Sequence, residues 1–136
     1  MNVEKGNNMN SWIKIAASPM SREFSKYMQS LGWEQYPGRP SLLTKKFIEN
    51  ETGKPVLFAY NCYRYQISYG DEPLYTVEGG FYDLDENGKP TGYERRGTKK
   101  DIFETLYRGE DFKDLDGMKN SVNNLLSKIK QDFKEI

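Results

Sequence analysis

The chain has 136 residues, with 20 basic and 20 acidic side chains, a formal net charge of +0, one cysteine and no histidine. This length is typical of one domain, and the neutral charge balance argues against both a strongly basic nucleic-acid binder and an acidic nucleic-acid mimic. The absence of histidine excludes Ser-His and Cys-His nucleophiles and histidine-ligated metal sites. The sequence has no apolar run of the ~20 residues that a membrane span needs and no secretory signal, so we expect a cytoplasmic protein without membrane contact.

The first residues are predicted to lie outside the packed part of the protein. Residues 1–10 are polar and asparagine-rich, which is typical of a mobile tail, and residues 11–136 are expected to form a single α+β domain. The alternation in residues 11–17 predicts a short edge strand.

A helix is predicted to follow, with Ser18 as its N-cap, Pro19 at its first position and Gly32 after its end. Its apolar residues recur at steps of three and four: Phe24, Tyr27, Met28 and Leu31. Residues 33–40 contain two prolines and are expected to form a loop.

The middle of the chain predicts a meander of four to five antiparallel strands. The expected strands are residues 42–50, 56–69, 74–84 and 91–96. The pair Gly79-Gly80 in the third of them is expected to form a β-bulge. In residues 56–69 neither side of the alternation is polar, so we expect helices on one face and a partly exposed aromatic face on the other.

Two helices are predicted after the strands. Thr98 can cap a short helix over residues 99–107, and Asp114 or Asp116 can cap a longer one. The apolar face of the longer helix comprises Met118, Val122, Leu125, Leu126, Ile129, Phe133 and Ile136. The predicted fold class is therefore α+β: an antiparallel meander sheet of four to five strands, covered by an N-terminal helix and a C-terminal amphipathic helix.

One segment has the ligand spacing of a calcium-binding EF-hand loop. Its oxygen-bearing residues are Asp83, Asp85, Asn87 and Glu94, with Gly88 at the sixth position. However, Pro90 removes an N–H that such loops use, and both flanks are strand-like, whereas an EF-hand needs helices. A hairpin turn with a positive φ at Gly88 is the favoured interpretation, so we expect no cofactor and keep these residues as a weak metal candidate.

Tyrosines and arginines gather on the predicted sheet. The candidate partner-binding residues are Tyr60, Tyr63, Arg64, Tyr65, Tyr69, Tyr93, Arg95 and Arg96. Tyrosine is a good strand former whose ring packs while its hydroxyl stays in water, so these residues can be purely structural. Exposed Tyr and Arg are also typical of protein interfaces, and aromatics beside basic residues can stack the bases of single-stranded nucleic acid.

The sequence offers little for catalysis. Cys62 lies mid-strand without a histidine partner and is expected to be a small buried residue. The carboxylates of the Asp83–Glu94 segment could hold magnesium for a nuclease, but neither the strand pattern of such enzymes nor a G-x-x-x-x-G-K phosphate loop is present.

We therefore expect a small non-enzymatic binding protein, either an inhibitor or an adaptor, that contacts another protein as a monomer or homodimer. The alternative is a single-stranded nucleic-acid binder that uses the Tyr/Arg face. The excess of lysine over arginine and the frequent asparagine and tyrosine suggest AT-rich coding, which fits a phage or another mobile element.

Overall fold

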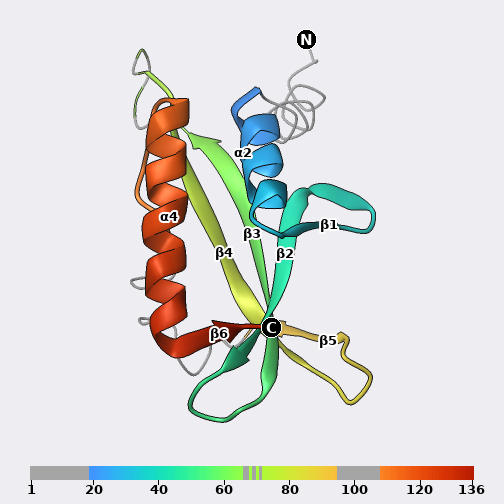
Figure 1. Ribbon diagram of the computed structural model, residues 1–136. Coiled ribbons are helices and arrows are strands. Elements are labelled where there is room, and N and C mark those ends of the chain that lie inside the picture. The colour runs from blue at the N-terminus through green and yellow to red at the C-terminus, as the bar shows by residue number, and fades with distance from the viewer. Residues whose placement is uncertain (1–18, 66–67, 69, 71, 95–107) are drawn as a thin grey trace.

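The computed structural model describes residues 19–65, 68, 70, 72–94 and 108–136, with only the backbone described at 65 and 92–94 (Figure 1). The elements are α2 (Pro19–Ser30), β1 (Glu34–Tyr36), β2 (Arg39–Glu49), β3 (Pro55–Tyr65), β4 (Leu74–Leu84), β5 (Pro90–Glu94), α4 (Leu115–Asp132) and β6 (Phe133–Glu135). The strands form one curled antiparallel sheet in the order β1-β2-β3-β4-β5, and β6 pairs with β2. The predicted α+β class, with an N-terminal and a C-terminal helix, is confirmed.

Strand β3 lies at the centre of the sheet between β2 and β4, and all three have 11 residues. The meander β2-β3-β4-β5 was predicted, with β4 having the predicted bounds. The outer edge of β2 is shared by two short strands: β1 pairs with its first half, and β6 pairs with Phe47, Ile48 and Glu49 near its end.

The alternation along β3 decides where the core lies. Val56, Phe58, Tyr60 and Cys62 are at most 4% exposed. Both α2 and α4 contribute to the same hydrophobic core as these residues, so the two helices cover one face of the sheet (Figure 1). We call the opposite side of β2, β3 and β4 the outer face, because no helix in the described part of the chain lies over it.

The ring of Phe58 is the centre of the core. Its centroid lies 5.2 Å from that of Phe47 on β2, 5.2 Å from that of Phe81 on β4 and 4.9 Å from that of Phe133 on β6. The contacts with Phe47 and Phe133 are edge-to-face, an arrangement that complements the charge distribution of aromatic rings. One side chain thus joins four strands.

The two helices are tied to each other as well as to the sheet. The Tyr27 hydroxyl on α2 donates to Asn123 Oδ1 on α4 at 3.0 Å, and Lys119 Nζ lies 5.6 Å from the centre of the Tyr27 ring. Asp114 is the N-cap of α4, as predicted, and its Oδ1 accepts from the Gly117 N–H at 2.8 Å. Neither described helix is long and apolar enough to cross a membrane.

The prediction that the last helix extends to Ile136 is wrong. Helix α4 ends at Asp132, and Phe133 has extended backbone angles (φ −135, ψ 146) as the first residue of β6. Phe133 is still buried, but through strand pairing with Glu49, and Ile136 is 71% exposed. The backbone of β2 offers hydrogen-bond partners there, which the helical pattern of the sequence does not reveal.

The prediction that residues 33–40 form only a loop is also wrong. Glu34 and Gln35 pair with Thr44 and Leu43, so this segment makes a hairpin with the start of β2. Gly38, with φ +80, lies at its turn, where a left-handed backbone favours glycine.

The predicted bulge at Gly79-Gly80 is absent. Strand β4 keeps one unbroken register with β3 through both residues, which face Tyr60 and Ala59. Glycine at position 79 instead permits a close backbone approach, because a Cβ there would lie 1.9 Å from the carbonyl oxygen of Ala59.

Several predicted features lie outside the described residues: the tail at 1–10, the edge strand at 11–17, the Ser18 cap and the helix at 99–107.

The close approach at Gly79 generates a stability prediction. A Gly79→Ala change forces β3 and β4 apart and should lower the free energy of unfolding by about 1–3 kcal/mol in urea denaturation, as other overpacked sites do. Glu78→Ala is the matched control. Glu78 is next to Gly79 in the chain, and its exposed side chain makes only an exposed ion pair with Arg108. Equal stability of Gly79→Ala and the unmodified protein would show that the strands are not held this close.

Candidate functional site

The structure divides the predicted Tyr/Arg group between the two faces of the sheet. Tyr60 is fully buried, and its ring lies 5.9 Å from Trp33 and 6.0 Å from Phe58. The prediction that Tyr60 belongs to a partner-binding surface is therefore wrong, because the alternation of side chains along β3 places Tyr60 on the helix-covered face. Tyr63 is half-buried on the outer face, and its neighbour Arg64 is exposed on the other side of the strand.

The remaining members of that group are not placed. Only the backbones of Tyr65 and Tyr93 are described, and Tyr69, Arg95 and Arg96 lie outside the described residues. Tyr63 is therefore the predicted residue around which an outer-face site can be built.

The outer face combines large side chains with a row of small ones. Leu57 on β3 faces Tyr82 on β4, and both are half-buried. Leu84 and Ile48, also half-buried, occupy the same face of β4 and β2. Small residues lie between these side chains and Tyr63: Thr44, Ala59 and Gly80, one from each of the three strands, in register. Alternation in the sequence could have singled out Leu57 and Tyr82, once the covered face was known.

Asn61 lies on the outer face beside Tyr63. Its Nδ2 donates to the Tyr63 hydroxyl oxygen at 3.0 Å. Its Oδ1 is buried without a hydrogen-bond partner, the only such side-chain atom found among the described residues. A buried acceptor left unpaired costs roughly 1–3 kcal/mol, so this oxygen lowers the stability of the fold.

A concave feature lies on the helix side of the sheet, and we call it the helix–hairpin groove. It separates α2 from the β1–β2 hairpin and has a volume of about 630 Å³. Arg22 and Lys26 line its helix wall, and Arg39 and Ser41 line its hairpin wall. The groove is not foreseeable from the sequence pattern, because residues 33–40, with their two prolines, predict a loop and not the hairpin wall. The spacing of Arg22 and Lys26 by four residues was the available signal for a basic helix face.

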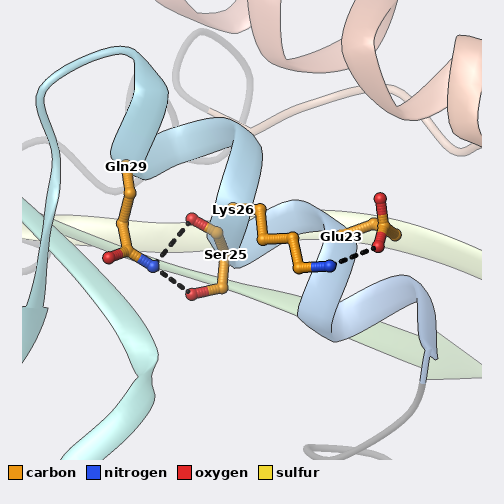
Figure 2. A network of polar contacts seen from close by, with 4 residues as sticks. All are labelled: Glu23, Ser25, Lys26 and Gln29. Atoms are coloured by element: carbon orange, nitrogen blue, oxygen red, sulfur yellow. Dashed lines mark hydrogen bonds and ion pairs between the residues drawn. The ribbon is translucent and has the colours of Figure 1, made fainter.

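The floor of the groove is held by side-chain amides. Ser25, only 8% exposed, accepts at Oγ from Gln29 Nε2 at 3.0 Å and from Gln35 Nε2 at 3.4 Å. Gln29 Nε2 also donates to the Ser25 carbonyl, at 3.3 Å (Figure 2). Because Gln35 Nε2 donates to the Pro40 carbonyl at 3.1 Å as well, one side chain links the helix to the hairpin.

The Asp83–Glu94 segment forms the hairpin between β4 and β5. Asp85 Oδ1 accepts from the N–H groups of Asn87 at 2.8 Å and Lys89 at 2.9 Å, and Gly88 has φ +78. One carboxylate oxygen is therefore engaged in holding the turn. No group of three His, Cys, Asp or Glu residues placed to hold a metal was found in the described part of the chain, and the Glu94 side chain lies outside it.

Cys62 is buried, as predicted, and is 4% exposed. Burial away from water disfavours the thiolate and raises the pKa of the Cys62 thiol from 9.0 to about 12. A thiol that stays protonated is a poor nucleophile.

Comparisons of the chain with protein-family models, curated proteins and solved structures found no match.

The hairpin geometry generates a prediction for the calcium candidate. Asp85→Ala removes the acceptor of two turn hydrogen bonds and should lower the free energy of unfolding by about 1–2 kcal/mol, whereas millimolar calcium should leave the melting temperature unchanged. Glu86→Ala, an exposed neighbour, is the matched control. A calcium-dependent rise in melting temperature that Asp85→Ala abolishes would instead establish a cation site.

The raised pKa of Cys62 predicts a pH dependence of stability. Between about pH 9 and pH 12 the thiol ionises in the unfolded chain but stays protonated in the folded one, so rising pH favours unfolding. In this window Cys62 should lower the free energy of unfolding by about 1.4 kcal/mol per pH unit. Cys62→Ala removes this contribution. The free energy of unfolding of the unmodified protein, measured by urea denaturation, should therefore fall toward that of Cys62→Ala as pH rises. If the difference in the free energy of unfolding between the two proteins does not depend on pH, the raised pKa of Cys62 is contradicted.

Proposed function

We propose that this protein is a non-enzymatic binding protein, an inhibitor or an adaptor, that holds a protein partner on the outer face of its sheet. The observation that carries the proposal is the set of half-buried large side chains on this face: Leu57 and Tyr82 face each other, and Tyr63 lies farther along β3 beside Asn61. Tyrosine rings that keep a hydrogen-bonding hydroxyl are typical of the energetic centres of protein interfaces.

The chemistry of the described side chains favours binding over catalysis. The thiol of Cys62 is buried and stays protonated, and one carboxylate oxygen of Asp85 is engaged in a turn. The hydroxyl and amide groups of Tyr63, Tyr82 and Asn61 on the outer face suit recognition rather than proton transfer at neutral pH.

A protein partner fits the charges of the outer face better than a nucleic acid does. Lys46 faces Leu57 across the β2–β3 ladder, and Glu78 faces Asn61 across the β3–β4 ladder, so both signs are present. Single-stranded nucleic acid needs cations beside the stacking rings for its phosphates. Arg64 projects from the opposite side of β3 from Tyr63, which weakens the nucleic-acid alternative.

We further infer a cytoplasmic protein of a phage or other mobile element. The support is compositional: one cysteine, no disulfide among the described residues, and a lysine-, asparagine- and tyrosine-rich chain. Both monomeric and homodimeric forms fit this function.

The proposal is tested by affinity capture from bacterial lysate with purified protein, with and without nuclease, followed by mass spectrometry. We expect one stoichiometric protein to survive nuclease treatment, and Tyr63→Ala to reduce its recovery at least about tenfold, as removal of a hot-spot ring does. Tyr36→Ala is the matched control, because Tyr36 is a 37% exposed tyrosine on β1 at the far edge of the sheet.

Two results would contradict the proposal. Recovery that depends wholly on nucleic acid and falls steeply with salt would favour the nucleic-acid alternative. Undiminished recovery with Tyr63→Ala, at an unchanged melting temperature, would remove the outer face from the interface.

A further inference from the structure

We propose that the helix–hairpin groove binds an acidic, extended segment of a partner polypeptide, through Arg22 and Lys26 on α2 and Arg39 on the hairpin. This site is separate from the outer face. Arg39 lines the groove together with residues of α2, so it lies on the helix side of the sheet.

Charge is the first argument. Among the described residues, the groove lining includes three cationic side chains, from Arg22, Lys26 and Arg39, and no carboxylate, and Lys26 is paired with Glu23 beside the groove. The whole chain has 20 basic and 20 acidic residues, so this groove concentrates positive charge that the overall composition does not predict. Positive charge inside a concave surface attracts anions more strongly than the same charge on a flat surface.

The arrangement of these cations favours several carboxylates over one compact anion. Arg22 and Lys26 are one helical turn apart on α2, and Arg39 lies on the other wall. Charges distributed over two walls of a groove of about 630 Å³ suit an extended chain with acidic side chains on both sides.

The amides of the groove supply the second argument. Gln29 and Gln35 each donate through Nε2 to oxygens of the protein, which fixes their orientation. The Gln29 carboxamide oxygen is turned away from Ser25 (Figure 2). Such an oxygen can accept a hydrogen bond from a peptide N–H, which an extended polypeptide supplies along its length.

The segments of this chain outside the described residues lack the complementary charge. Residues 1–18 contain two lysines and one glutamate, and residues 95–107 contain four basic and two acidic side chains. A cationic groove repels net positive segments, so the occupant is a segment of another polypeptide.

Glu23 provides an internal competitor. Its Oε2 lies 3.3 Å from Lys26 Nζ, and the side chains of Glu23 and Lys26 are 43% and 74% exposed. An incoming carboxylate must compete with Glu23 for Lys26 (Figure 2). Removal of the Glu23 charge should therefore strengthen binding, which a merely damaged protein would not show.

The experiment measures fluorescence anisotropy of a labelled hexaglutamate peptide with the full chain at low salt, with hexaglutamine as the uncharged control peptide. We expect hexaglutamate alone to bind, and its affinity to fall with added salt. Lys26→Gln and Arg39→Gln should each weaken binding about three- to tenfold, and Glu23→Gln should strengthen it by about the same factor. Lys54→Gln is the matched control, since Lys54 is exposed in the turn at the other end of β2 and loses the same charge.

Three outcomes would overturn the proposal. The first is no binding of hexaglutamate at low salt. The second is an equal loss of affinity with Lys54→Gln and Lys26→Gln, which would reveal unspecific attraction. The third is complete displacement of the peptide by millimolar inorganic phosphate at constant ionic strength, which would make the groove a phosphate site.

Discussion

The fold depends on the burial of one aromatic ring at the centre of the sheet. Phe58 contacts rings from β2, β4 and β6, so strands that adjoin in the sheet are also joined through a common side chain. Removing such a ring from water stabilises the fold by roughly 1.5–3 kcal/mol, and each edge-to-face pair adds about 0.5–1.5 kcal/mol. The helices then cover the face that carries this ring, and no described helix lies over the opposite face.

Both candidate binding surfaces follow from which face of the sheet the helices cover. On β3 the odd-numbered residues Leu57, Asn61 and Tyr63 are excluded from the core because the even-numbered ones fill it. At the other edge, α2 is drawn onto the core by Phe24 and Met28, which are both 0% exposed. Its opposite side then faces the β1–β2 hairpin across the groove. Two surfaces of different character, one aromatic and one cationic, thus arise on opposite sides of β2.

The parts of the fold that can be predicted from the sequence are those with a repeated local pattern. The bounds of β4 and the Asp114 cap follow from residues that are close together in the chain. The strands β1 and β6 have only three residues each, too few for any periodicity, and they exist because β2 offers them a free edge. The helix–hairpin groove could not be foreseen without β1.

The candidate site shows the same division between local and long-range information. Alternation correctly separates Tyr60 from Tyr63, but it does not say which of them faces the helices. That depends on the total volume of apolar side chains that α2 and α4 must bury, a property of the assembled core. The unpaired oxygen of Asn61 is likewise invisible in the sequence, because a missing hydrogen bond is a fact about three-dimensional surroundings.

The position of β6 has a consequence for folding during synthesis. Phe47 pairs with Glu135, so a strand made early in translation waits for residues near the end of the described chain before its outer edge is complete. Contacts between such distant parts of a chain slow folding, because a long loop must close before they form. Until then the nascent chain exposes a strand edge beside the apolar side chains of Phe47 and Ile48, the kind of surface that chaperones bind and that aggregates grow from.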